Sequence, residues 1–547
     1  MKTRKTLFAS FSFLFLGLAP ISAMGQILPH TFTANTAAKA SEVNANFTYL
    51  LERFGTRKTT VNCYSGESIT TALQNYNHIV ISGVCTENIS LDGETLPHRV
   101  VILEGNSSAS DGITASSSAS PVIDINYHVF VRVKNLTLKG GQMGLKVRRN
   151  GIALISNSIV ENNSGHGICA CGTSFMLSES NIIRNNSSSG IYATDNAEVS
   201  IKSNTISGHS GGSSITITQG AFANIKSNII TGSSGYSAVV ISRGSSANIV
   251  SNTIQSAYNG ISVQDSSHAI LKNNSVKYNS KNGLQVDNNA SVSLAEGNTF
   301  SNNAQNGMGA WLGGSINMWC DSQLTSATTI SGNTVGPIAI EEGGIANLCN
   351  LTLNVSTVGI TTQNNSTVNI TNSSLTSSSE RVIYSRGGVA LDIDNTTITG
   401  NSSNVAVKLN DGSNLQISNS TISGAKGGIG AVYNSTIRLQ GGNAITGNTQ
   451  EGIYLLNSTL HQYSDAGTTT ISSNTGSEIK AERSFLSLDG VTITGTGGST
   501  EVDLKYGSLL MLGSGSSVTG TVTCGNTAPD NGTFVNNSGT TVTTSGC

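Results

Sequence analysis

A short Asn-x-Ile phrase returns at a nearly constant interval between residues 150 and 300. Its asparagines recur at steps of 24, 23, 24, 24, 22 and 24, at Asn157, Asn181, Asn204, Asn228, Asn252, Asn274 and Asn298. A second landmark, a small residue followed by Ile, Val or Leu, comes about ten residues after most of them. A fixed period in the twenties is typical of a stacked solenoid, in which each repeat contacts its neighbours.

The residues within each repeat predict short strands. Apolar and polar side chains alternate in residues 190–194 and 198–202, so one face of each segment would point inward. So short a period leaves no room for a helix of ordinary length. We therefore expect coils of three short strands, with aliphatic ladders inside. The repeated asparagines would stack at one turn, where this side chain hydrogen-bonds backbone and accepts left-handed dihedrals.

Composition excludes several classes of protein. The chain has 547 residues, only 11% of them charged, and a net charge of -2. This balance is neither that of a basic nucleic-acid-binding protein nor that of an acidic disordered tail. Disordered chains also lack β-branched residues at regular spacing, which are present here.

Residues 1–25 predict a secretory signal peptide. Lys2, Arg4 and Lys5 form its positive end, residues 7–18 its apolar core, and small residues precede a cleavage point near Gly25. No later stretch is apolar for long enough to span a bilayer. We therefore expect a secreted or periplasmic protein.

An amphipathic helix is predicted within the N-terminal segment, residues 26–60. Val43, Phe47, Leu50 and Phe54 stand at steps of 4, 3 and 4. Barely two heptads are present, so two alternatives stay open for residues 33–54. The helix could join copies of the chain in an oligomer, or it could pack against the end of the solenoid.

Eight cysteines fit an oxidising compartment. Eight cysteines allow 105 pairings, from which the repeat selects sequential pairing. The predicted disulfides are Cys63–Cys85, Cys169–Cys171, Cys320–Cys349 and Cys524–Cys547. Three of the separations in sequence, 22, 29 and 23, are close to one repeat, so these bridges would join one coil to the next. The rival interpretation, a zinc site, lacks a second cysteine pair at the required spacing, so no metal is predicted.

The N-terminal part of the chain carries a recognisable arrangement. An export signal is followed by a Ser-Ile-x-x-Ala-Leu helix at residues 68–73, bracketed by Cys63 and Cys85, and then by the Asn-x-Ile repeats. This order resembles the right-handed parallel β-helix proteins of the pectin-lyase-like superfamily, over roughly residues 61–520. The resemblance and the repeat together predict an all-β chain, a right-handed parallel β-helix solenoid in which the period of 22 to 24 sets the length of one coil.

The predicted organisation has five parts. A signal peptide (1–25) and a helical segment (26–60) precede an N-terminal helical cap (61–104), which would cover the open end of the solenoid. The parallel β-helix itself would span 105–520, and a disulfide-closed tail would span 521–547. About 19 coils at ~4.8 Å each would give a rod ~90 Å long.

The resemblance does not bring a complete catalytic motif. Polygalacturonase-like enzymes use Asn-Thr-Asp, Asp-Asp, Gly-His-Gly and Arg-Ile-Lys in that order, whereas here Gly165-His166-Gly167 lacks the preceding acidic motifs. We interpret His166 as a turn residue, and no catalytic residue is assigned. The alternative candidates are Arg243, Asp265 and Asp287 on consecutive coils, ~5 Å apart.

Two carboxylates at so short a distance are typical of a retaining glycosidase. In a lyase they could hold a Ca²⁺ ion against an acidic sugar. We favour a solvated salt bridge between Arg243 and a neighbouring acid.

Two groups of residues are candidates for binding. Alternation would point Arg132, Lys134, Lys146 and Arg148 outward, as a cationic patch near the N-terminal end. The patch could bind an anionic polysaccharide, although solubility alone also explains it. Trp311 and Trp319, the two tryptophans, could offer stacking faces to sugars or could pack as local core under the Cys320 loop.

Together these patterns predict a secreted β-helix protein that binds a polysaccharide or cell-surface glycan without catalysis, as an adhesin does. The alternative is a polysaccharide lyase or glycoside hydrolase acting on an acidic polysaccharide. No cofactor is predicted for the binding protein, and Ca²⁺ would enter only with a lyase. Neither nucleic acid nor a membrane span is expected.

Overall fold

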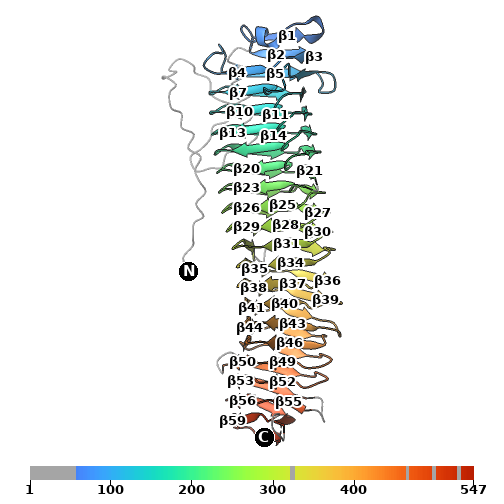
Figure 1. Cartoon of the computed structure of the whole chain (residues 1–547), viewed down its shortest axis with the longest axis vertical. Helices are drawn as coiled ribbons and strands as arrows, with labels where there is room; N and C mark the ends of the chain where they lie inside the picture. Colours follow the sequence, from blue (N-terminus) through green and yellow to red (C-terminus); the bar gives the residue numbers. More distant parts are fainter. Residues whose placement is uncertain (1–56, 234, 321–326, 464–466, 496–499, 526–530) are drawn as a thin grey trace, which may run out of the picture.

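A computed structural model describes residues 57–233, 235–320, 327–463, 467–495, 500–525 and 531–547. The predicted signal peptide (1–25) and the predicted helix within 33–54 lie outside the described residues. The described strands stack into one long rod, with β1 at one end and the C terminus at the other (Figure 1). The predicted right-handed parallel β-helix is thus confirmed.

Each coil contributes one strand to each of three walls. In one coil these are β11 (Ile152–Ser156), β12 (Ile159–Glu161) and β13 (Ile168–Cys171). The next coil repeats them as β14 (Phe175–Glu179), β15 (Ile182–Arg184) and β16 (Ile191–Thr194), which pair with the first three in parallel and in register. We call the walls the first, second and third sheets in that order.

The three sheets run the length of the rod. The first sheet has 21 strands, from β1 (Lys58–Asn62) to β59 (Thr533–Asn536), which at ~4.8 Å per strand gives ~95 Å. The second sheet is divided into 11 strands, β3 (Val84–Thr86) to β33 (Thr329–Ser331), and 8 strands, β36 (Thr352–Val355) to β57 (Ser517–Thr519). The third sheet begins at β4 (Ile89–Asp92) and ends at β60 (Thr543–Ser545).

The third sheet carries most of the residues discussed below. Its strands in that region are β7 (Ile123–Asn126), β10 (Leu145–Arg148), β13, β16, β19 (Ile215–Ile217), β22 (Val239–Ile241), β25 (Ile261–Val263), β28 (Leu284–Val286), β31 (Asn306–Ala310) and β34 (Gly336–Ile340). Because successive coils are in register, a side chain on one strand lies directly beside its counterparts on the strands before and after it.

The core is one continuous apolar column. Alternate residues of each strand point inward, as in β11, where Ala153 and Ile155 are buried. The buried aliphatic side chains of the three sheets form a single cluster that extends from Val61 to Cys524. The predicted aliphatic ladders are confirmed. Burial of their apolar surface is the main source of the free energy that stabilises the stacked coils.

An asparagine ladder joins neighbouring coils, as predicted. The backbone N–H of each ladder asparagine donates to Oδ1 of the next one, at 2.8–3.1 Å, through Asn181, Asn204, Asn228, Asn252, Asn274 and Asn298. Asn157 does not belong to this ladder, because the N–H of Ser158 donates to Oδ1 of Asn181 at 2.9 Å. The prediction was wrong at Asn157 by one residue.

The left-handed backbone lies one residue before the ladder. Positive φ angles occur at Asn157, Ser180, Ser203, Ser227, Ser251 and Asn273. The six ladder asparagines, all within the described residues, do not share this conformation. The expectation that they accept left-handed dihedrals was therefore wrong. Asparagine recurs at these positions because its side chain hydrogen-bonds to the neighbouring coil.

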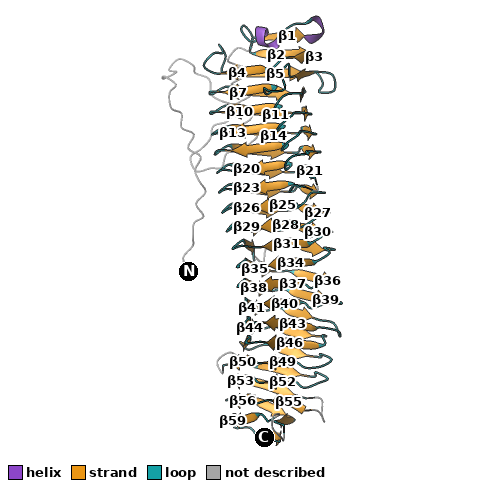
Figure 2. Ribbon diagram, viewed as in Figure 1, coloured by secondary structure: helices purple, strands orange, loops and turns teal. Residues whose placement is uncertain are grey.

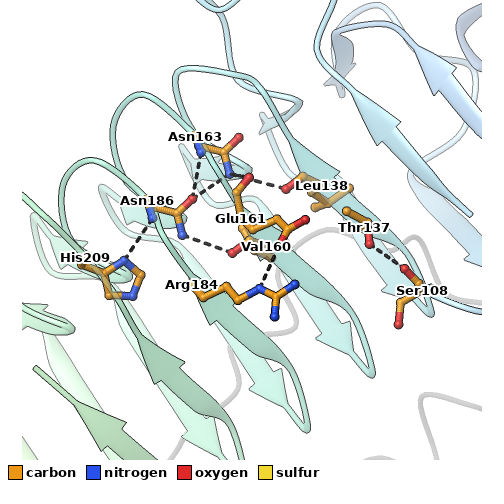
Figure 3. Close-up of polar contacts among 9 residues, drawn as sticks. All are labelled: Ser108, Thr137, Leu138, Val160, Glu161, Asn163, Arg184, Asn186 and His209. Carbon is orange, nitrogen blue, oxygen red and sulfur yellow. Dashed lines mark hydrogen bonds and ion pairs between the residues drawn. The ribbon is translucent and has the colours of Figure 1, made fainter. Parts of the chain in front are cut away.

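A second ladder, which the sequence did not reveal, follows the second sheet (Figure 3). The N–H and Nδ2 of Asn163 donate to Oδ1 of Asn186 at 3.1 and 2.9 Å. Further along the rod it resumes with Asn279, Asn303 and Asn333. Asn333 thus follows Asn303 in this second ladder and does not continue the first ladder from Asn298.

This second ladder explains the glycine landmark. A Cβ added at Gly167 would lie 2.7 Å from Nδ2 of Asn186, and one at Gly283 would lie 2.8 Å from Nδ2 of Asn303. These distances are too short for a real side chain. Glycine therefore recurs where the amide of the next coil approaches the third sheet.

The N-terminal cap contains the helical elements of the described chain (Figure 2). These are η1 (Cys63–Ser65) and α2 (Ile69–Ala72), with Ser68 as N-cap accepting the N–H of Thr71 at 3.2 Å. Ile69 is fully buried, so α2 closes the apolar column. At the other end, β58 (Thr521–Thr523), β59 and β60 pair with preceding strands, and the predicted tail continues the coils.

The four predicted disulfides are all formed. Their Cα–Cα distances are 4.8 Å for Cys63–Cys85, 5.8 Å for Cys169–Cys171, 5.6 Å for Cys320–Cys349 and 4.8 Å for Cys524–Cys547. The Cys169–Cys171 bridge lies within β13, whereas the other three join residues 22 to 29 positions apart.

Candidate binding site on the third sheet

The four predicted cationic residues lie on two different walls. Arg132 and Lys134 belong to β8 (Phe130–Lys134) of the first sheet, whereas Lys146 and Arg148 belong to β10 of the third sheet. β9 (Thr137–Lys139) of the second sheet separates the two strands along the chain. The single patch expected from the sequence is therefore not formed, because successive strands of one coil face in different directions.

Two of these cations are in ion pairs. Nζ of Lys134 lies 3.0 Å from Oε1 of Glu104, and Nη2 of Arg148 lies 2.8 Å from Oδ2 of Asp124. Burial alone would raise the pKa of Glu104, yet its hydrogen bonds to Lys134 and His78 hold that pKa below its usual value. Lys134 is thus matched by a carboxylate and adds little free positive charge to the first sheet.

Lys146 and Arg148 lie beside a shallow depression on the outer face of the third sheet, with a volume of about 430 Å³. It spans β10, β13 and β16 and is lined by Met143, Lys146, Arg148, Arg149, His166, Cys169, Cys171, Gly172, Thr173, Tyr192, Thr194 and Asp195. Cations, aromatic rings and a disulfide therefore meet on three adjacent strands.

A stacked pair of rings forms one part of the lining. The His166 and Tyr192 rings are stacked with centroids 4.4 Å apart and planes 13° from parallel. Nδ1 of His166 accepts the N–H of Ser189 at 3.2 Å, and burial lowers the pKa of His166. His166 does lie in a turn, as predicted, but its ring is part of the depression.

Two of the three cations of the depression, Arg148 and Arg149, are held in place by their neighbours. Lys146 lies beside Cys169, and Arg148 lies beside Cys171, across the β10–β13 pairing. The guanidinium of Arg149 lies 4.8 Å from the centroid of the Tyr127 ring and donates to the hydroxyl of Tyr127. A cation over an aromatic face is stabilised by the ring quadrupole. The depression is thus positively charged along this edge.

The predicted acidic residues lie further along the same sheet. Arg243 and Asp265 occupy left-handed turns after β22 and β25, and Asp287 follows β28. Oδ1 of Asp265 accepts from Nδ2 of Asn288 at 3.1 Å, and Oδ2 of Asp287 accepts from Nε2 of Gln285 at 2.6 Å. The structure joins Arg243 to neither aspartate by an ion pair, so the favoured salt bridge was wrong.

Asp287 has an unusual environment. It is 9% exposed, and its Oδ1 is buried without a hydrogen-bond partner. Burial, and then the charge of Asp265, raise the pKa of Asp287 above its usual value. The two carboxyl groups thus interact across neighbouring coils, as the spacing predicted. Among the described residues, no three His, Cys, Asp or Glu side chains gather where they could hold a metal ion.

The two tryptophans do not form one site. Trp311 follows β31 on the third sheet, where its ring lies over Gly309 and its Nε1 donates to Oε2 of Glu341 at 3.3 Å. Trp319 follows β32 (Ser315–Met318) on the first sheet and is 49% exposed. Trp311 therefore shares a sheet with the depression, five strands from β16, or ~24 Å.

The described chain includes no helix that is both long enough and apolar enough to cross a membrane.

Comparison with known proteins defines the family. The sequence profile of the right-handed β-helix region matches residues 74–254, 179–335 and 316–505. The chain belongs to the right-handed β-helix family. No curated protein matches it.

Several solved structures match this β-helix protein at low identity. A GH87 α-1,3-glucanase catalytic domain in complex with nigerose is 12% identical, with 78% of this chain and 68% of that chain covered and a TM-score of 0.22. The PL6 family alginate lyase AlyGC is 10% identical, with coverages of 89% and 99% and a TM-score of 0.28. PfbA, a surface adhesin of Streptococcus pneumoniae, is 11% identical, with coverages of 77% and 93% and a TM-score of 0.21. At these scores the likenesses carry no argument about fold or function.

Proposed function

We propose that the protein binds an acidic polysaccharide in the depression on its third sheet. The observation that carries this proposal is the stacked pair of His166 and Tyr192 beside the cations Lys146 and Arg149. Aromatic faces pack against the apolar faces of sugar rings, and cationic side chains pair with carboxylate or sulfate groups. The two kinds of contact in one depression suit a charged sugar better than a neutral one.

The scaffold supports this function by holding the side chains in place. β13 is paired with β10 on one side and with β16 on the other, so the floor of the depression is continuous sheet. Sites built on strands are more precise than sites built on loops, and little conformational entropy is lost on binding. Arg148 is further fixed by its ion pair with Asp124.

Calorimetric titration with oligosaccharides of galacturonic acid and of glucose tests the proposal. We expect the acidic series to bind and the neutral series to bind more weakly. Tyr192→Ala should weaken acidic binding by about 1 kcal/mol, roughly fivefold. Tyr278→Ala removes an exposed tyrosine from another wall and should leave binding unchanged. Equal affinity of wild type and Tyr192→Ala would contradict the proposal.

A second candidate function, cleavage of an acidic polysaccharide, is favoured by Asp287. A carboxyl group whose pKa is raised by burial is suited to donating a proton, and Trp311 follows on the next coil as a stacking face. In a lyase Asp287 would instead be ionised, and Asp265 and Asp287 would supply two carboxylates toward a Ca²⁺ ion, whose charge would favour the ionised form of Asp287. The remaining ligands of the six to eight that Ca²⁺ takes would come from water and the sugar.

Product release from the acidic oligosaccharides, measured with and without added Ca²⁺, tests this second function. We expect cleavage that is lost in Asp287→Asn and retained in Asp411→Asn, at an exposed aspartate outside both candidate sites. Cleavage at the wild-type rate in Asp287→Asn would exclude Asp287 as the proton donor.

We also propose an extracellular or periplasmic location, supported by the four disulfides. Oligomerisation through 33–54 stays a prediction, and sedimentation of the mature chain with and without these residues tests it.

A further inference from the structure

The Cys169–Cys171 bridge differs from the other disulfides in what it connects. Both cysteines lie on β13, two positions apart, so both side chains point to the outer face of the third sheet. The bridge joins no coil to another, and β13 is held in register by its pairing with β10 and β16. Opening it therefore removes no link on which the rod depends.

The sulfur of Cys171 is also placed where a small molecule can reach it. Both cysteines line the depression, and Cys171 is the more exposed of the two, since Cys169 is 1% exposed. Lys146 lies beside Cys169 and Arg148 beside Cys171 on the preceding strand. Neighbouring cations stabilise thiolates and thus favour thiolate as attacking and leaving group.

We propose that Cys169–Cys171 is a redox-active disulfide that exchanges with small-molecule thiols entering the depression. This activity does not depend on carbohydrate binding. It shares Lys146 with that proposal, but the disulfide itself has no part in carbohydrate binding.

The exchange proceeds in two balanced steps. A thiolate RS⁻ attacks Sγ of Cys171, a new sulfur–sulfur bond forms, and the Cys171–Cys169 bond breaks. Cys169 leaves as a thiolate beside Lys146. A second thiolate then attacks the sulfur of the R group, which releases the Cys171 thiolate and forms RSSR. Two thiols are oxidised, one protein disulfide is reduced, and the two protons of the thiols pass to the protein thiolates or to solvent.

Graded reduction of the folded protein tests this proposal. The intact chain is incubated with increasing glutathione, quenched with iodoacetamide, and its cysteines are mapped by mass spectrometry. We expect Cys169 and Cys171 to be alkylated at least tenfold faster than the other six cysteines, while circular dichroism stays unchanged. Alkylation of any other disulfide first, or resistance of this pair until the chain unfolds, would overturn the proposal.

Charge variants test the role assigned to Lys146. Lys146→Gln should slow reduction of the pair by about threefold to tenfold. Lys480→Gln is the matched control, because Lys480 is also a half-buried lysine on the third sheet, in β52 (Ile479–Glu482). Equal rates in Lys146→Gln and wild type would refute assistance by this cation.

A Cys169→Ser, Cys171→Ser double variant should keep its fold, and its unfolding would show that the bridge is structural. Titration with galacturonic acid oligosaccharides reports separately on the carbohydrate proposal.

Discussion

Nδ1 of His209 accepts the backbone N–H of Asn186 at 3.4 Å, in the position that an asparagine Oδ1 occupies one coil earlier (Figure 3). His209 is 2% exposed, and its Nε2 has no hydrogen-bond partner. Burial lowers the pKa of His209 to about 4, against backbone hydrogen bonds that act in the opposite direction. The imidazole is thus neutral at pH 7, and it ends the run of amides that begins at Asn163.

His209 should make the rod less stable in acid. Because its folded pKa lies below the usual 6.5, its contribution to stability is complete above pH 6.5 and is lost as the pH falls toward 4. The expected loss is about 3 kcal/mol. Urea unfolding of wild type and His209→Asn at pH 7 and pH 4 measures it. The variant extends the run of amides by one residue and should lose less stability between these pH values, whereas parallel pH profiles would contradict the argument.

The ladder asparagines should matter far more than exposed ones. Asn228 accepts two hydrogen bonds from Asn204, and its Nδ2 donates to the Ile201 carbonyl and to Asn252. Asn228→Ala leaves these buried groups without partners and should cost about 3 kcal/mol. Asn414→Ala, at an exposed position, is the control. Urea unfolding followed by circular dichroism gives both values, and equal midpoints would exclude the ladder as a stabilising feature.

The glycine landmark should be intolerant of a single methyl group. In Gly167→Ala the new Cβ would meet the Gly190 carbonyl at 2.6 Å and Nδ2 of Asn186 at 2.7 Å. Relief of that overlap should cost about 1–3 kcal/mol. Gly235→Ala meets nothing within 4 Å and should be neutral. Thermal unfolding of the two variants tests this prediction. Similar melting temperatures would show that neighbouring coils move apart to admit the methyl group without loss of stability.

The architecture was predictable because the repeat imposes it. Its nearly constant period determines which side chains lie side by side, and the same period selected the disulfides. The slip at Asn157 arose because the phrase was aligned by its asparagine, whereas the structure aligns Ser158 with Asn181. A residue type that recurs in the sequence therefore gives the period of the repeat, but the hydrogen bonds between coils decide which residues are aligned.

The candidate site was only partly predictable. Lys146, Cys169 and Tyr192 are each one period apart, so the repeat places them side by side, yet Tyr192 was not recognised as a partner. The sequence did not separate Arg132 from Lys146, because turn lengths alone decide which wall a strand joins. The burial of Asp287 depends on neighbouring coils and leaves no local pattern.

Glu478 provides the opposite pH dependence to His209. It is 1% exposed and stands where other coils of the third sheet carry glycine, directly before β52. Its carboxyl group accepts hydrogen bonds from the N–H and Nδ2 of Asn474. Asn474 in turn accepts from the N–H and Nδ2 of Asn448 on the preceding coil, so Glu478 stands at the end of a further amide ladder. Burial is the largest cause that raises the pKa of Glu478, and the charge of Glu501 adds to it.

Glu478→Gln should therefore stabilise the rod at neutral and alkaline pH. A carboxyl group with a raised folded pKa contributes stability that is present below its unfolded pKa and is lost as the pH rises through the folded value. Glutamine keeps an oxygen for both donors of Asn474 and carries no charge. The urea midpoint of Glu478→Gln should exceed that of wild type at pH 8, and the two should converge at pH 4. Glu342→Gln, at a left-handed turn position, should show no such difference. A lower midpoint for Glu478→Gln at pH 8 would mean that the ionised carboxylate stabilises this end of the ladder.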